Sequence, residues 1–280
     1  MKKIGIIIGL MIVFQGCKSD KDVLVNINTQ FGTIKVLLYE ETPLHKKNFI
    51  ELVKEGKYDS TQWHRIMKGF MVQGGNVNEK EGTQESLEDR IPAEIISSFM
   101  HTKGALAAAR QPDRINPKKM SSASQFYIVH GKIFNKEELT IDQYALNQGL
   151  SELMRDPSYD TIAQQFIDLQ RGNKIKEMNQ LALRYVALVE SVQGISLRKD
   201  ISQDRLEAYT ALGGAPHLDN GYTIFGRVVA GLEVVDQIAS VSVGRANRPI
   251  EDLFMTMEIK VISKMEITKK YGYIYPEKLP

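Results

Sequence analysis

Apolar residues recur at every second position from Val23 onward, and this period limits the possible folds more than any other feature of the sequence. The positions lie on either side of a short turn at residues 29–32 and are Val23, Val25, Ile27, Ile34, Val36 and Leu38. A period of two places them on one face, which predicts an antiparallel hairpin with one buried face. Thr42 and Pro43 then indicate the start of a helix that ends near Gly56. We therefore expect a mainly β fold with a helix closing one end of a sheet.

Residues 57–75 mix an arginine, a histidine and a glutamine with large apolar residues, in a pattern that predicts two short strands around a Lys-Gly turn. Side chains alternate in direction along a strand. One face would carry Phe70, Val72 and Gly74, and the other Met71, Gln73 and Gly75. Such a segment can present an apolar floor beside a fixed polar group. Two ordinary core strands with a capped arginine would give the same pattern, so both interpretations stay open at this point.

Three motifs, in this order along the chain, closely resemble the signature of the cyclophilin-type peptidyl-prolyl cis-trans isomerases. They are residues 63–75, residues 103–110 with 121–129, and residues 218–228. The resemblance implies an eight-stranded antiparallel barrel capped by two helices and built from residues 23–130 and 214–266. The second helix would span residues 232–240, and the last strand residues 254–265. The inward side of that helix would carry Val234, Val235 and Ile238.

The resemblance also implies a site for twisting the amide bond that precedes proline. That rotation destroys amide resonance and has a barrier of about 18–20 kcal/mol, but it requires no nucleophile. Arg65 would be the catalytic group, donating from its permanently charged guanidinium to the prolyl amide as the nitrogen pyramidalises, and Gln73 would orient it. The family's proline pocket is matched by Phe70, Met71, Tyr127 and Leu218. The positions that hold the residues preceding proline are matched by Gln125 and by the backbone around Ala109 and Arg110.

Two ring residues depart from the common family pattern. Tyr222 stands where many members have histidine, and Tyr127 where many have phenylalanine, so both changes keep a ring at the site. A phenol in a dry pocket must find a hydrogen-bond partner or reach water, and we expect this of Tyr127. His217 stands where some relatives have a tryptophan that contacts cyclosporin, which predicts weak binding of that drug.

No other class of site is indicated. The five histidines show no metal-ligand spacing and have no cysteine partners, and they are His45, His64, His101, His130 and His217. The chain contains no nucleophile elbow and no phosphate-binding glycine loop, so we expect no cofactor and no metal. His64 adjoins Arg65, but isomerisation needs no proton transfer, so we expect a core histidine bonded to backbone. A net charge of +2 gives no case for nucleic acid as a partner.

An insertion of 83 residues, 131–213, separates the second and third motifs. Its pattern is helical. One seam has apolar residues three and four positions apart, namely Met178, Leu181, Tyr185, Leu188 and Val192. Ser202 predicts the cap of a further helix that stops at Gly213 and Gly214. The insertion leaves and rejoins the barrel within four residues of Tyr127 and Leu218. It would therefore extend the surface that holds unfolded chains, dock a partner, or be a passive decoration packed on the barrel.

The N-terminus has the pattern of a secretory signal peptide in residues 1–16, with two lysines before a short apolar run. This run, from Ile4 to Phe14, is shorter than the roughly 20 residues of a membrane-spanning helix. The single cysteine, Cys17, follows directly, and residues 14–17 resemble the lipobox of bacterial lipoproteins. We expect lipidation at Cys17, a polar tether at residues 17–22 and a C-terminal tail at residues 267–280. Removing Lys2 and Lys3 would leave equal numbers of acidic and basic residues.

Together these features predict a peptidyl-prolyl cis-trans isomerase that acts on proline-containing exported proteins and is held by a lipid anchor at the membrane of a bacterial cell envelope. A cyclophilin-like binding module or chaperone, using the pocket or the helical insertion without turnover, is the alternative. A binder would need the pocket but not the pair Arg65 and Gln73. Nothing in the sequence sets the oligomeric state, for which a monomer is the default expectation.

Overall fold

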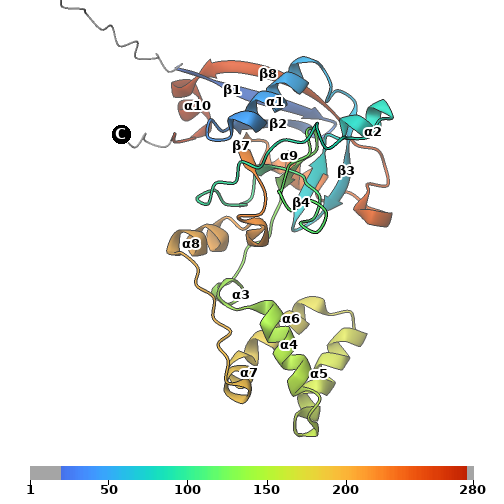
Figure 1. The fold of residues 1–280 in the computed structure, drawn as a ribbon, viewed down its shortest axis with the longest axis vertical. Coiled ribbons are helices and arrows are strands. Elements are labelled where there is room, and N and C mark those ends of the chain that lie inside the picture. Colours follow the sequence, from blue (N-terminus) through green and yellow to red (C-terminus); the bar gives the residue numbers. More distant parts are fainter. Residues whose placement is uncertain (1–19, 276–280) are drawn as a thin grey trace, which may run out of the picture.

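Eight strands close into an antiparallel barrel in the computed structural model, which describes residues 20–275 (Figure 1). The strands are β1 (Lys21–Thr29), β2 (Gly32–Leu38), β3 (Thr61–Met67), β4 (Met71–Gly74), β5 (Ala105–Ala108), β6 (Phe126–Val129), β7 (Ile224–Ala230) and β8 (Phe254–Ser263). They follow the order β1-β2-β7-β5-β6-β4-β3-β8 around the barrel. Closure removes the exposed edges that an open sheet would leave. The predicted eight-stranded antiparallel barrel with a helical insertion is confirmed.

The barrel core forms where the period-two pattern predicted it. In the hairpin of β1 and β2, Val25 pairs with Val36 and Ile27 with Ile34, and all four are fully buried. Five aromatic rings fill the interior, and the centroids of neighbouring rings lie 5.0–5.8 Å apart. The rings belong to Phe49, Tyr58, Trp63, Phe126 and Phe225. Aromatic side chains bury large areas in tilted and edge-on contacts, so this cluster anchors the barrel.

Two helices pack against this core. Helix α1 (Pro43–Lys54) buries Phe49 and Val53, and α9 (Leu232–Ile238) buries the three residues predicted to face inward. Thr42 precedes α1 as predicted, but its side chain caps no helix N–H and its hydroxyl donates to the Tyr39 carbonyl at 3.5 Å. Helix α9 ends two residues before the predicted limit. A short helix, α2 (Val77–Glu81), follows β4.

Both ends of the described chain carry more structure than the sequence pattern indicated. Strand β1 begins at Lys21, within the predicted tether, because Asp22 is buried and accepts a hydrogen bond from Lys46 Nζ at 2.8 Å. Strand β8 ends at Ser263, whose hydroxyl caps helix α10 (Lys264–Tyr271), so the predicted strand to residue 265 is two residues too long. Ile267 on α10 is fully buried, which fixes the first turns of the predicted tail against the barrel.

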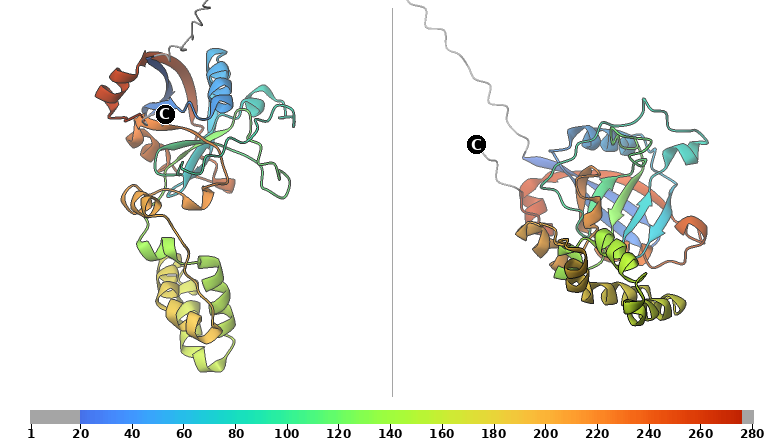
Figure 2. Two further views of the ribbon diagram at one scale, coloured as in Figure 1. Left: turned by 60° about the vertical axis from the view of Figure 1, so that its left-hand side comes forward. Right: turned by 60° about the horizontal axis from the view of Figure 1, so that its bottom comes forward.

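The insertion is helical, as predicted, and extends away from the barrel (Figures 1 and 2). Its helices are α3 (Lys136–Thr140), α4 (Gln143–Leu153), α5 (Asp160–Arg171), α6 (Ile175–Arg184), α7 (Val186–Gln193) and α8 (Gln203–Ala211). Helices α4 to α7 form what we call the distal bundle, with an apolar core of its own. The buried members of that core are Ile141, Leu146, Leu150, Leu153, Ala182, Val186, Val189 and Leu197. Helices α3 and α8 lie between the bundle and the barrel (Figure 1).

The continuous seam predicted across residues 178–192 is wrong. The helix breaks at Tyr185, whose φ and ψ of −97° and 7° separate α6 from α7. The break changes the phase of the second half, so Val189 is buried and Val192 is 51% exposed. Ser202 does precede α8, but its side chain makes no capping hydrogen bond.

Among the described residues, no helix combines the length and the apolar character needed to cross a membrane. The predicted signal peptide, residues 1–16, and the predicted lipidation site, Cys17, lie outside the described residues.

Candidate active site

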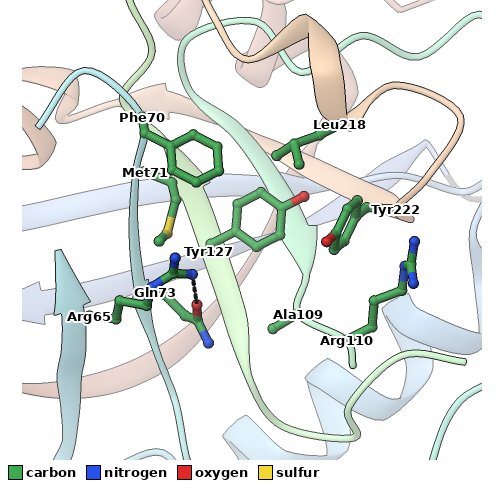
Figure 3. Close-up of a pocket in the computed structure, with 9 residues that line it drawn as sticks. All are labelled: Arg65, Phe70, Met71, Gln73, Ala109, Arg110, Tyr127, Leu218 and Tyr222. Atoms are coloured by element: carbon green, nitrogen blue, oxygen red, sulfur yellow. Dashed lines mark hydrogen bonds between the residues drawn. The ribbon is translucent and has the colours of Figure 1, made fainter. Parts of the chain in front are cut away.

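A cavity of about 190 Å³ opens on the barrel beside β4 and β6 (Figure 3). Nine residues line it, and they are Arg65, Phe70, Met71, Gln73, Ala109, Arg110, Tyr127, Leu218 and Tyr222. The structure thus brings together nine of the ten pocket residues suggested by the sequence. The tenth, Gln125, lies next to the cavity and contacts it through Gln73. These residues come from β3, β4, β6 and the segments after β5 and before β7, so only the closed barrel assembles them.

The polar side of the cavity is a chain of three side chains. Arg65 on β3 is the cross-strand partner of Gln73 on β4, and its Nη1 donates to Gln73 Oε1 at 3.4 Å. Gln73 Nε2 donates in turn to Gln125 Oε1 at 3.2 Å. Arg65 Nη2 also contacts Met67 Sδ at 3.2 Å. Because both ends of the Gln73 amide are engaged, its carbonyl is held toward Arg65, and the guanidinium is oriented at the cavity wall (Figure 3).

The remaining walls are mostly apolar. Met71, Tyr127 and Leu218 are 2%, 4% and 8% exposed, and Phe70 is half-buried. The prediction that Phe70 shares a face with Val72 is wrong. Phe70 precedes the first residue of β4, so strand alternation does not apply to it, and its ring contacts His217 at a centroid distance of 5.1 Å. Val72 points into the barrel core, whereas Met71 and Gln73 line the cavity as their position on the other face predicted.

The hydroxyl of Tyr127 has the partner that a buried phenol requires. It forms a hydrogen bond with His101 Nε2 at 3.0 Å, behind the cavity wall. Burial raises the pKa of Tyr127 well above its ordinary value, so the hydroxyl stays protonated. Sequence reasoning had considered His101 only as a metal ligand and missed this contact. The sequence did indicate that Tyr127 needs a hydrogen-bond partner, because a phenol in an apolar motif demands a polar neighbour, but it did not identify that partner.

Arg110 contributes its side chain to the site. The family resemblance had suggested a role only for its backbone. Its Nε donates to the Gly221 carbonyl at 2.7 Å, and its Nη1 lies 2.6 Å from Asp113 Oδ1. The guanidinium carbon lies 4.4 Å from the centroid of the Tyr222 ring. A cation stacked on an aromatic face is attracted to it, so Arg110 holds Tyr222 against the cavity.

His64 is not a cavity residue. Burial lowers the pKa of its imidazole, while the predicted bond to backbone, made with Gln62, acts in the opposite direction. Its buried Nδ1 has no hydrogen-bond partner within residues 20–275. Over the same described range, no three histidine, cysteine, aspartate or glutamate residues are grouped as a metal site. At the cavity, Arg65 presents hydrogen-bond donors beside a mostly apolar surface.

Comparison with known proteins agrees with this geometry. The family model described as cyclophilin type peptidyl-prolyl cis-trans isomerase/CLD matches residues 24–147 and 197–260. The unmatched stretch, residues 148–196, covers most of the distal bundle, whereas α3 and α8 fall inside the matched ranges.

Individual relatives extend the match into the insertion. A putative peptidyl-prolyl cis-trans isomerase of Staphylococcus epidermidis is 25% identical over 240 residues, covering 84% of this chain and 89% of the relative. A putative bifunctional phosphatase/peptidyl-prolyl cis-trans isomerase of Streptococcus pyogenes serotype M6 is 27% identical over 242 residues. That match covers 84% of this chain but only 38% of the length of the streptococcal protein.

Among solved structures, a Cryptosporidium parvum cyclophilin type peptidyl-prolyl cis-trans isomerase is similar with a TM-score of 0.51 at 18% identity. The similarity covers 87% of this chain and 99% of the solved one. At this identity the likeness concerns the fold.

Proposed function

The chain belongs to the cyclophilin-type peptidyl-prolyl cis-trans isomerase family, and we propose that it accelerates the isomerisation of Xaa-Pro amides in polypeptide substrates at the cavity beside Arg65. The observation that carries this proposal is the oriented guanidinium. A module that only bound proline would need the apolar walls, but it would gain little from a chain of hydrogen bonds that aims an arginine along them.

The apolar walls supply the first part of the mechanism. A proline ring seated against Met71, Tyr127 and Leu218 displaces water from the cavity and fixes one side of the rotating bond. The residues before proline then lie along the rim formed by Gln125 and the backbone of Ala109. Rotation about the amide can proceed because only one side of the bond is gripped tightly.

Arg65 supplies the second part. As the amide twists, its nitrogen loses conjugation and becomes pyramidal, so its lone pair can accept a hydrogen bond that the planar ground state cannot. A donor aimed at that position stabilises the twisted state more than the planar one, which lowers the barrier. The hydrogen bond from Arg65 to Gln73 restricts the guanidinium to the cavity side of β3 before substrate arrives. No covalent bond forms and no proton is transferred.

A protease-coupled proline isomerisation assay on the full chain tests this function. We expect Arg65→Ala to lower kcat/KM for a proline tetrapeptide by about 100-fold or more, the usual loss of a donor that acts in the transition state. Arg65→Lys should also be impaired, because an ammonium lacks the planar set of donors. Arg248→Ala is the matched control, since Arg248 is an exposed arginine that pairs with Glu79. An inactive wild type, or an Arg65→Ala variant as active as the control, would refute the proposal.

We also propose that this activity acts on exported client proteins and that the protein is held by a lipid anchor at Cys17. The support is the basic and apolar pattern of residues 1–16 followed by the single cysteine. Only residues 18–20 separate Cys17 from β1, and three residues span at most about 11 Å. Labelling with a radioactive fatty acid tests the anchor, and incorporation that persists in Cys17→Ala would contradict it.

A further inference from the structure

A chain of buried and partly buried polar side chains runs behind the proline cavity and ends in the insertion. Tyr127 on β6 bonds to His101 Nε2 at 3.0 Å, and His101 Nδ1 bonds to Asp219 Oδ1 at 2.9 Å. Asp219 Oδ2 accepts the hydroxyl of Tyr209 at 2.6 Å and the guanidinium of Arg205, both from α8. We call these five residues the buried relay. His101 and Tyr209 are fully buried, and the side chain of Asp219 is 7% exposed.

The direction of each hydrogen bond in the buried relay follows from Asp219. Burial alone would raise the pKa of Asp219, but hydrogen bonds from His101 and Tyr209 lower it below its ordinary value. An ionised carboxylate only accepts, so His101 Nδ1 must carry a hydrogen. In the neutral imidazole, Nε2 is then the acceptor, and the hydroxyl of Tyr127 is the donor. Asp219 thus sets the tautomer of His101, which in turn sets the orientation of the Tyr127 hydroxyl.

The buried relay bears on the cavity through two of its walls. The Tyr127 ring forms one wall, and Tyr222 packs edge-on against Tyr127 at 5.9 Å and against His101 at 6.3 Å. While Tyr127 donates to His101, its hydroxyl is satisfied away from the proline site, and the cavity keeps an apolar surface. If that partner were displaced, the phenol would need water, and water beside the proline ring would weaken substrate binding.

We propose that α8 keeps the proline cavity apolar by orienting the Tyr127 hydroxyl through the buried relay. Arg205 and Tyr209 are then positioning residues for Tyr127. This inference rests on the proposed isomerase function and assigns part of the insertion to the active site. It divides the insertion in two: α8 supports the cavity, and the distal bundle does not. If Asp219 only fastened α8 to the barrel, His101 would not need to connect its carboxylate to Tyr127 at the cavity wall.

A double-mutant cycle on the full chain separates these roles. Tyr209→Phe removes one hydroxyl and keeps the ring, so we expect KM for a proline tetrapeptide to rise about threefold to tenfold, with kcat within about twofold. In the Tyr127→Phe background the hydrogen bond between His101 and the cavity wall is absent, and Tyr209→Phe should raise KM much less than it does in the wild type. Tyr185→Phe, a bundle tyrosine bonded to Gln165, is the matched control and should leave KM unchanged in both backgrounds. An equal rise in KM in both backgrounds, or no rise in either, overturns the proposal.

A measurement without turnover separates failure of this inference from failure of the isomerase function. Tyr209→Phe should shift the imidazole ¹⁵N resonances of His101 and the ring resonances of Tyr127 in NMR spectra of the substrate-free protein. Shifts confined to residues of α8 and Asp219 overturn the buried relay, whatever the activity of the wild type. Unchanged fluorescence of the barrel residue Trp63 verifies that the variant is folded.

Discussion

The barrel and the distal bundle differ in how their elements hold one another. Barrel strands far apart in sequence pair directly, as β1 does with β8, and the closed sheet surrounds a core of packed aromatic rings. The distal bundle is made of neighbouring helices of at most 12 residues around a small aliphatic core, and α5 contributes no buried residue. The proline cavity lies entirely on the barrel. The site is therefore built on the region whose backbone is fixed by long-range strand pairing.

The connection between the two regions is narrow. Ile141 and Arg198 form an antiparallel bridge, and backbone hydrogen bonds join Asp142 N to the Leu197 carbonyl at 2.8 Å and Lys199 N to the Thr140 carbonyl at 2.7 Å. The chain therefore enters and leaves the distal bundle side by side. A local connection of this kind allows the two regions to unfold separately, which can be tested because each has its own spectroscopic signal. Trp63, the single tryptophan, reports on the barrel, and far-ultraviolet circular dichroism reports mainly on the helices.

The largest effect is expected from a cavity in the barrel core. Phe126 is 1% exposed and contacts the rings of Phe49, Tyr58 and Trp63. Phe126→Ala should lower the barrel's free energy of unfolding by about 3–5 kcal/mol, because it removes packed apolar area and leaves a void. Urea unfolding followed by Trp63 fluorescence measures the loss. An equal shift of the helical transition would show that the two regions unfold as one unit and would contradict their separate stability.

A smaller effect, confined to the other region, is expected at Gly149 on α4. A Cβ at this position would lie 2.4 Å from Val189 Cγ1 on α7, so the two helices pack here only without a side chain. Gly149→Val should destabilise the distal bundle by about 1–3 kcal/mol through overpacking and leave the Trp63 transition in place. Ser151→Val, at an exposed position of the same helix, controls for the change in helix propensity. Matching losses in the two variants would contradict this account of the helix contact.

The two regions should also differ in how their free energy of unfolding responds to mild acid. Burial lowers the pKa of His45 in the barrel, although its hydrogen bond with Glu94 at 2.7 Å acts in the opposite direction; its Nε2 bonds to Ser121 at 2.9 Å. In the unfolded chain this histidine takes up a proton as the pH falls through about 6.5, whereas the lowered pKa of folded His45 delays protonation to a lower pH. The barrel's free energy of unfolding should therefore fall as the pH decreases below about 6.5, by at most about 1.4 kcal/mol per pH unit from this group.

The distal bundle has no histidine, and its transition should not move over the same range. The pKa of Asp142 at the start of α4 is lowered by a hydrogen bond from the Ala145 backbone, so its contribution is lost only as the pH falls below about 3.8. Urea unfolding at pH 7 and pH 5.5, with both signals recorded, tests the contrast. A Trp63 transition that is independent of pH would contradict it.

The sequence was informative where neighbouring residues carry the information. The resemblance of three short motifs to the family predicted the barrel and the residues that line the cavity, and the observed strand pairing places Arg65 opposite Gln73. Phe70 was placed on the wrong face because it lies one residue before β4, where alternation has not begun. The break at Tyr185 was missed because apolar spacing alone does not show where a helix ends.

The buried relay could not be predicted, because it joins His101, Tyr127 and residues 205–219, which are separate parts of the chain. Asp219 reads as a turn residue, and only the fold shows that α8 brings Tyr209 and Arg205 to its carboxylate. The side chain of Arg110 was overlooked for a similar reason, since its contact with Tyr222 crosses more than a hundred residues. Local patterns predict elements and faces, whereas polar contacts between loops depend on the finished packing.

The most direct test of the central claim, that catalysis belongs to the barrel and α8 but not to the distal bundle, is to remove the bundle. Residues 143–196 can be replaced by Gly-Gly, because Asp142 and Leu197 are already hydrogen-bonded partners and a two-residue loop can join them. Ile141→Ser and Leu197→Ser remove apolar side chains that would lose their bundle neighbours. Native Trp63 fluorescence establishes that the shortened chain is folded.

The measurement is kcat/KM of this shortened chain for a proline tetrapeptide. We predict a value within about twofold of the full chain, since distant and independent regions contribute separately. Adding Arg65→Ala to the shortened chain should lower that value by about 100-fold, as in the full chain. A folded shortened chain whose kcat/KM is more than about tenfold lower than that of the full protein would contradict the claim.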